Sequence, residues 1–132
     1  MYLTNSTLTH IVICDILFWE VIFIISNFNS DLIRGHIDTF ILKMLTEKDS
    51  YGYEIIKSIL LKSNKKYELK EPSLYTSLKR LEKGNFINSY WGDESLGGRR
   101  KYYKITDSGR EKLEKSFNDW LIAKEIIDLL LN

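Results

Sequence analysis

The stretch from Glu71 to Thr106 constrains the fold more than any other, because a helix with well-marked ends is followed there by two short strands. Pro72 suits the first turn of a helix, where its missing N–H leaves no hydrogen bond unmade, and Glu71 is expected at the cap. Gly84 is expected to end the helix in the left-handed conformation that glycine adopts at little cost. These signals predict a helix over residues 72–83.

The predicted helix has an apolar side and a polar, basic side. Leu74, Leu78 and Leu81 recur at helical spacing and form the side that we expect to be buried. Hydroxyls and cations lie off that side, as in helices that enter the major groove of DNA and meet base edges and phosphates. The residues concerned are Ser73, Tyr75, Thr76, Ser77, Lys79 and Arg80. Taken alone, this face fits a solvated amphipathic helix better, since most polar helix faces meet only water.

Two strands joined by a basic turn follow the helix. Phe86–Trp91 and Tyr102–Ile105 are rich in aromatic and β-branched residues, and turn residues separate them. The turn contains Gly97 and Gly98, which let the backbone bend, and then three cations expected to meet phosphates, namely Arg99, Arg100 and Lys101. A helix followed by a hairpin with a basic tip predicts a winged helix-turn-helix, a fold that is mainly α with a small β-hairpin.

Four short strings in this part of the chain are typical of one protein family. They are Pro72-Ser73-Leu74-Tyr75, Arg80-Leu81-Glu82, Gly97-Gly98-Arg99-Arg100-Lys101-Tyr102-Tyr103 and Ile105-Thr106-Asp107-Ser108-Gly109. On these strings, about residues 30–132 resemble the PadR family of bacterial transcriptional repressors. The resemblance implies a homodimer that binds double-stranded promoter DNA. The alternative from another class is a winged-helix module for protein–protein contact, which needs neither the basic tip nor the hydroxyl-bearing helix face.

Trp120 and the run from Ser89 to Ser95 resemble one group within the family, the LmrR-like multidrug-binding repressors. In that group, matching tryptophans of two subunits stack flat aromatic ligands across a pore. The resemblance therefore implies that Trp120 binds a planar aromatic effector whose binding releases the DNA. An ordinary core tryptophan is the alternative. Lys124 lies on the same helix face and departs from the partly acidic pore that suits cationic drugs.

Apolar residues at helical period predict three further helices. We expect them over Asp31–Lys48, where Asp31 is the cap, over Tyr51–Lys62, and over Asp107–Leu131, where Thr106 is the cap. The polar segment 63–70 alternates around Tyr67 and Leu69 and is expected to add a short strand to the wing.

The long helix predicted after the wing carries more apolar surface than one small domain covers. One side holds Leu113, Phe117, Trp120, Ile127 and Leu131, and a further apolar set is Leu121, Ala123, Ile126 and Leu130. A second copy of the chain is the natural cover, so we expect a DNA-binding domain over residues 29–106 and a dimerisation helix over residues 107–132. A two-fold dimer presents two recognition helices to half-sites about one helical turn, roughly 34–36 Å, apart.

Positive charge is concentrated around the predicted helix and wing. The 132-residue chain has a formal net charge of +1, yet residues 62–104 hold eleven Lys/Arg and five Asp/Glu, a local +6 that leaves −5 for the remainder. A basic face on an acidic body is the charge distribution that DNA binding needs.

The residue types argue against several other classes of protein. Cys14 is the single cysteine, so no internal disulfide forms and a cytoplasmic protein is expected, while His10 and His36 do not have metal-ligand spacing. Gly97 and Gly98 precede a strand rather than a helix, unlike a nucleotide-binding loop. No motif places a nucleophile. We therefore expect neither an enzyme nor a metal site nor a cofactor.

Residues 1–28 form an apolar extension that the family resemblance does not cover. Ile11–Phe28 is strongly apolar, and the first basic residue of the chain is Arg34. Asp15 and Glu20 argue against a membrane span, since each costs about 2.5–3.5 kcal/mol at a helix centre if Glu is treated like Asp. Three interpretations stay open: an extra helix on the dimer, a membrane tether of the regulator, and upstream sequence included by an early start codon. We favour the third.

We predict that a chain beginning at Asn29 folds, dimerises and binds DNA as the full chain does, because the signals for the winged helix all lie after that residue. Circular dichroism, sedimentation and DNA titration of the two chains check this. A shortened chain that no longer dimerises would show that residues 1–28 belong to the domain.

Overall fold

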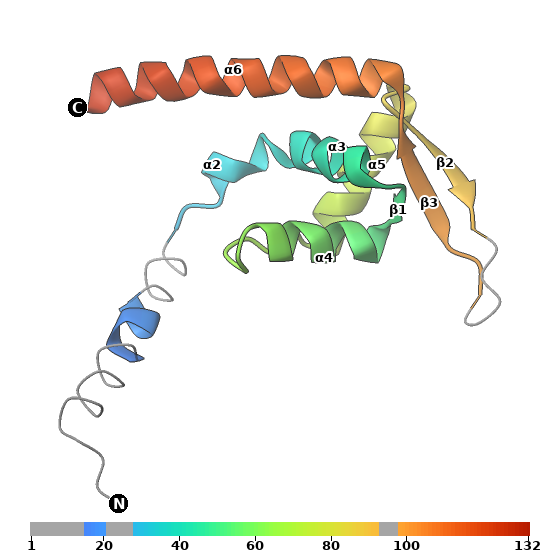
Figure 1. Cartoon of the computed structure of the whole chain (residues 1–132), viewed down its shortest axis with the longest axis horizontal. Coiled ribbons are helices and arrows are strands. Elements are labelled where there is room, and N and C mark those ends of the chain that lie inside the picture. The colour runs from blue at the N-terminus through green and yellow to red at the C-terminus, as the bar shows by residue number, and fades with distance from the viewer. Residues whose placement is uncertain (1–14, 21–27, 93–97) are drawn as a thin grey trace, which may run out of the picture. The chain divides into compact units, whose positions relative to one another are not determined.

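The computed structural model describes residues 15–20, 28–92 and 98–132, and residues 1–32 form a unit separate from residues 33–132. The described elements are α2 (Asp31–Arg34), α3 (Ile37–Glu47), β1 (Ser50–Tyr51), α4 (Gly52–Lys62), α5 (Glu71–Lys83), β2 (Ile87–Trp91), β3 (Lys101–Ile105) and α6 (Asp107–Leu131) (Figure 1). A winged helix-turn-helix with a long C-terminal helix, as predicted, is confirmed. Within the described residues, no helix has the length and apolarity needed to cross a membrane.

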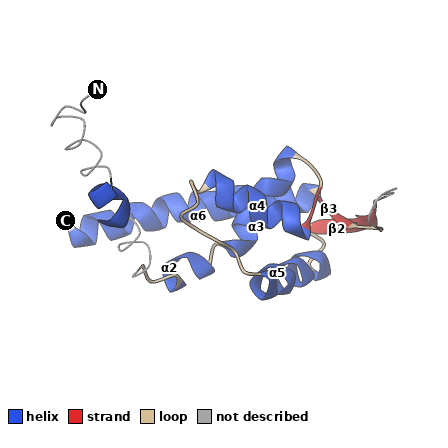
Figure 2. Cartoon of the chain, turned by 90° about the horizontal axis from the view of Figure 1, so that it is seen from below, coloured by secondary structure: helices blue, strands red, loops and turns tan. Residues whose placement is uncertain are grey.

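α3 lies at the centre of the second unit, with α6 on one side and α4 on the other (Figure 1). Its apolar residues Ile41, Leu42 and Leu45 are fully buried, and the helix also contacts α5 and β3. The predicted apolar side of α5 is confirmed, because its three leucines are at most 1% exposed and join this core; they are Leu74, Leu78 and Leu81. Figure 2 shows the hairpin of β2 and β3 extending from one end of the helices.

The sheet has three strands in the order β1-β3-β2, and both pairings are antiparallel. The hairpin was predicted to within one residue at each strand, but the third strand was placed wrongly. It is β1, not segment 63–70, because the chain turns there: Asn64 and Lys65 have positive φ and the Ser63 hydroxyl accepts a hydrogen bond from the Tyr67 N–H at 3.1 Å. Leu69 then enters the core, where it is 2% exposed.

The predicted helix over residues 31–48 is in fact two helices. A turn at Gly35 and His36 separates α2 from α3. Asp31, predicted as the cap, is instead the first residue of α2, and its N–H donates to the side chain of Asn29 at 3.0 Å.

The ends of α5 differ from expectation by one residue. Lys70, rather than Glu71, occupies the cap position, and the left-handed residue after the helix is Asn85 at φ 63°, not Gly84 at φ −80°. Gly84 keeps helical geometry because its N–H bonds the Arg80 carbonyl at 3.0 Å. Glycine is still required there for space, since a Cβ would lie 2.6 Å from the ring of Phe86.

The start of α6 is fixed to the end of α5 and to the hairpin. The Thr106 hydroxyl accepts the Gly109 N–H at 3.0 Å, which confirms the predicted cap, and it donates to the Asn85 carbonyl at 2.7 Å. Gly109 packs so closely on Phe86, the residue before β2, that an added Cβ would lie 2.1 Å from the Phe86 carbonyl oxygen. This close contact sets where the long helix leaves the wing.

We predict that Gly109→Ala lowers the free energy of unfolding by about 1–3 kcal/mol or more, because a backbone carbonyl cannot move aside as a flexible side chain can. Gly35→Ala is the matched control: its Cβ meets nothing within 4 Å, so we expect a gain of up to about 1 kcal/mol. Urea unfolding at one protein concentration checks both. Equal effects of the two substitutions would contradict the packing at Gly109.

Candidate nucleic-acid interface

The exposed side of α5 carries four of the predicted contact residues, namely Ser73, Tyr75, Thr76 and Lys79. The Thr76 hydroxyl donates to the Pro72 carbonyl at 2.8 Å, which orients its oxygen lone pairs outward along the helix. Tyr75 lies over the start of α4, where a Cβ on Gly52 would come 2.9 Å from the tyrosine oxygen. The absence of a side chain at Gly52 therefore lets α4 and α5 approach at this point.

Of the two other residues predicted for the same side, Ser77 is buried, whereas the side chain of Arg80 is 59% exposed but is hydrogen-bonded within the protein. Ser77 is only 2% exposed, so its expected place on the outer face is wrong. Arg80 donates from Nε to Asp38 Oδ2 at 2.9 Å, and from Nη2 to Asp38 Oδ1 at 2.7 Å and to Ser77 Oγ at 3.1 Å. The hydrogen bond to Asp38 and its negative charge raise the pKa of the Arg80 guanidinium, which stays charged.

A row of three tyrosines crosses the sheet of the wing. Tyr102 on β3 stands opposite Tyr51 on β1 and Tyr90 on β2 in the strand register. The ring centroids of Tyr102 and Tyr51 are 5.6 Å apart edge to face, and those of Tyr102 and Tyr90 are 5.6 Å apart and stacked. Such cross-strand aromatic pairs each add about 0.5–1.5 kcal/mol beyond area burial. The row therefore stiffens the wing where its tip begins.

The three cations of the predicted tip all have partners in the wing or in α5. Arg99 lies 5.7 Å from the centroid of the Trp91 ring, and Arg100 lies 4.5 Å from that of Tyr51. Lys101 Nζ is 3.9 Å from Glu82 Oε1. Gly98 has φ +90°, as expected for a turn glycine, while Gly97 lies outside the described residues. Within the part of the chain that the structure describes, the side chains of the two arginines are thus oriented by aromatic rings and not by carboxylates.

A hydrogen bond ties the wing to the loop before β1. The Tyr90 hydroxyl donates to Asp49 Oδ2 at 2.6 Å, and this bond raises the pKa of Tyr90 above its usual value. Gly92 follows the same end of β2, and a Cβ there would lie 2.4 Å from the Tyr102 ring. The C-terminal end of β2 is therefore held closely against the tyrosine row.

Trp120, the predicted ligand-stacking residue, is 41% exposed on α6. Its ring meets the edge of His36 with centroids 5.3 Å apart, and His36 also stacks on Phe40 at 6.2 Å. The ring is therefore only partly covered within one chain. Large apolar side chains continue from Trp120 to the end of α6. The exposed ones are Leu121, Ile122, Ile126, Ile127, Leu129, Leu130 and Leu131.

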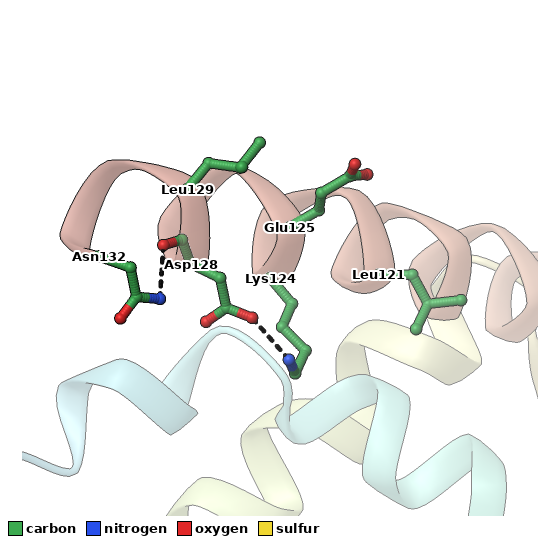
Figure 3. A pocket seen from close by; sticks show the side chains of 6 residues that line it. All are labelled: Leu121, Lys124, Glu125, Asp128, Leu129 and Asn132. Carbon is green, nitrogen blue, oxygen red and sulfur yellow. Dashed lines mark hydrogen bonds and ion pairs between the residues drawn. The ribbon is translucent and has the colours of Figure 1, made fainter.

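An open pocket lies along the last turns of α6 (Figure 3). Its lining residues are Leu121, Lys124, Glu125, Asp128, Leu129 and Asn132, and Trp120 is not among them. Lys124 donates to Asp128 Oδ2 at 2.7 Å, which raises the pKa of the lysine and balances its charge. The predicted positive charge beside Trp120 is thus paired with a carboxylate one turn away. Among the residues that the structure describes, there is no cluster of three or more His, Cys, Asp or Glu side chains that could hold a metal ion.

The partners of the predicted cations were not identified from the sequence. The missed residues are the carboxylates Asp38 and Glu82, which pair with Arg80 and Lys101. Asp49, which accepts a hydrogen bond from Tyr90, was missed as well. Arg80 and Asp38 are 42 positions apart and no local pattern joins them. The tyrosine row carried a usable signal, since pairing the predicted strands as a hairpin sets Tyr90 opposite Tyr102.

Residues 41–115 match the sequence profile of the transcriptional regulator PadR-like family, which is more than half of the chain. This chain belongs to the PadR-like family. A protein of Lysinibacillus sphaericus with no described function is 48% identical over 102 residues, which are 77% of this PadR-like chain and 94% of that protein.

Solved structures of other regulators share the fold. A transcriptional regulator from Clostridium thermocellum is 43% identical with a TM-score of 0.74, over 80% of this chain and 99% of that one. A PadR-like transcriptional regulator from Bacillus cereus is 32% identical with a TM-score of 0.65, over 78% and 99% of the two chains. The protein is accordingly a DNA-binding transcriptional regulator of PadR type.

Proposed function

We propose that this regulator contacts DNA with the exposed side of α5 and with the tip of the wing. Ser73, Tyr75, Thr76 and Lys79 lie on that side of α5 and reach base edges or the backbone in the major groove. Arg99 and Arg100, held against aromatic rings at the wing tip, contact phosphates. The observation that carries the proposal is the pairing of a hydroxyl-bearing helix face with two preoriented arginines on one winged-helix scaffold.

The regulator works as a homodimer whose shared surface includes the exposed apolar side of α6. A helix that leaves Leu129, Leu130 and Leu131 more than 70% exposed is not stable in water without cover, and a second copy supplies the same apolar surface. Binding of such a dimer to a promoter blocks transcription. We therefore infer a repressor, acting on DNA in the cytoplasm, and not an enzyme, since the family consists of transcriptional regulators.

The exposed ring of Trp120 is the proposed binding site for a planar aromatic effector. In the dimer, a flat ligand stacks on the face that His36 leaves open, since His36 meets the ring at 80°. Flat stacking and partial desolvation favour aromatic ligands of either charge, because Lys124 is already paired with Asp128. Binding there shifts the dimer toward a form with lower DNA affinity.

The experiment that tests DNA recognition is selection of binding sites from a random duplex library by the purified protein. We expect a palindromic consensus with half-sites about one helical turn apart. If the chain were a module for protein–protein contact, we would expect no enriched DNA sequence and no salt-dependent binding to DNA. The consensus duplex is the operator used in the measurements below.

We predict that replacing Arg99 and Arg100 by Ala weakens binding to operator and random duplex by the same factor. Each lost phosphate contact makes the slope of log affinity against log salt shallower by about 0.9. The control replaces Lys115 and Lys124 by Ala, which removes the same charge from α6 and leaves the slope unchanged. An unchanged slope in the arginine variant would remove the wing from the interface.

We predict that planar aromatic dyes quench the fluorescence of Trp120 saturably. A chain that begins at Asn29 and carries Trp91→Phe retains Trp120 as its single tryptophan. Trp120→Ala should abolish dye binding in calorimetry, whereas Trp120→Phe should keep part of it, because a stacked ring contributes about 0.5–1.5 kcal/mol beyond area burial. Absence of saturable quenching by neutral and cationic dyes alike would contradict an effector site at Trp120.

A further inference from the structure

The ion pair between Asp38 and Arg80 joins the recognition helix α5 to the first turn of α3. Two parallel N–H···O bonds of 2.9 and 2.7 Å connect the guanidinium to the carboxylate, from residues 42 positions apart. A bidentate pair fixes the orientation of both groups as well as their distance. The Asp38 side chain is 21% exposed, so its carboxylate is partly withdrawn from water. The contact therefore resists rotation of α5 relative to α3.

The guanidinium of Arg80 is also bonded along its own helix. Its Nη2 donates to the hydroxyl of Ser77, which is buried between α5 and the core. Arg80 is exposed, but turning its guanidinium away from Asp38 toward a phosphate would break all three bonds, and the partly withdrawn Asp38 carboxylate would lose its cation. Nε and Nη2 of Arg80 and both oxygens of Asp38 are thus engaged within the protein.

We propose that Asp38 and Arg80 are positioning residues for DNA recognition that set the angle of α5 on α3 without touching DNA themselves. Hydrogen bonds to base edges tolerate only small changes of distance and direction. A recognition helix free to rotate would keep its phosphate attraction but lose its base contacts. The inference rests on the proposed place of α5 in the interface, and it concerns specificity rather than general affinity.

Removal of Asp38 distinguishes this positioning role from a direct phosphate contact by Arg80, because the two roles predict opposite changes in DNA affinity. If Arg80 were a phosphate contact that Asp38 holds back, Asp38→Ala would free it, and binding to all duplexes would tighten with a slope steeper by about 0.9. If the pair positions α5, Asp38→Ala weakens operator binding and leaves random duplex binding close to that of the control.

The control for the lost negative charge is Glu47→Ala. Glu47 lies on α3 as Asp38 does, and it forms a carboxylate–cation pair with Lys62 on α4 instead of α5. Both substitutions therefore change the net charge equally and break one ion pair between helices. Only Asp38→Ala breaks a contact with the recognition helix.

Arg80→Lys keeps the positive charge but cannot form the bidentate fork. A positioning role predicts that Arg80→Lys and Arg80→Ala each lower the preference for operator over random duplex by roughly tenfold, about the discrimination of one bidentate base contact. The salt slope stays that of the unsubstituted protein. A phosphate contact predicts instead that Arg80→Lys resembles the unsubstituted protein and that Arg80→Ala gives a shallower slope.

The experiment measures dissociation constants of the full chain and these variants for the operator and a random duplex at several salt concentrations, with thermal unfolding of each. Lower operator preference in Asp38→Ala and Arg80→Lys, at unchanged slope, is the expected result. Tighter binding of Asp38→Ala than of Glu47→Ala, or normal preference in Arg80→Lys, would overturn the proposal. Lys79→Ala tests the interface separately, since an unchanged affinity and slope there would exclude α5 itself from DNA.

Discussion

The burial of α3 is the constraint on which the rest of the structure depends. Its residues Ile41, Leu42 and Leu45 are out of contact with water, and four elements cover them, α4, α5, α6 and β3. Each fully buried aliphatic side chain contributes about 1.5–3 kcal/mol, so no single covering element can shift without exposing part of this surface. The positions of α5, of the wing and of α6 are therefore all set by packing against one central helix.

This arrangement brings the regions proposed for DNA binding and for effector binding together at the first turn of α3. Asp38 reaches α5 through Arg80, and His36, two residues earlier, contacts Trp120 on α6. The turn at Gly35 and His36 ends α2 just before this point, so the first turn of α3 is also where the chain changes direction. α5 and the aromatic surface of α6 are in this way connected through side chains only two positions apart.

The elements that local signals specify were predictable from the sequence. Pro72 in the first turn, Thr106 at the cap and the aromatic strands act within a few residues, so the positions of α5, α6 and the hairpin followed from them. Contacts between distant residues were not predictable. Ser77 looked like part of a polar face, yet tertiary packing buries it beneath Arg80, and Ser50 and Tyr51 form a strand only because β3 is beside them.

The difference between local signals and contacts of distant residues also bears on the basic residues of the proposed interface. Counting charges in the sequence treats each cation between residues 62 and 104 alike, but the structure separates them by partner. Lys101 lies 3.9 Å from a carboxylate that is itself partly exposed, and such a surface pair is worth about 0–1 kcal/mol, so a phosphate replaces that partner readily. Arg80 has two aligned bonds to Asp38 and a third to Ser77, and exchange for a phosphate would break all three. We therefore propose that Lys101 adds to the salt dependence of DNA binding by releasing counterions, whereas Arg80 contributes to the shape that the DNA meets.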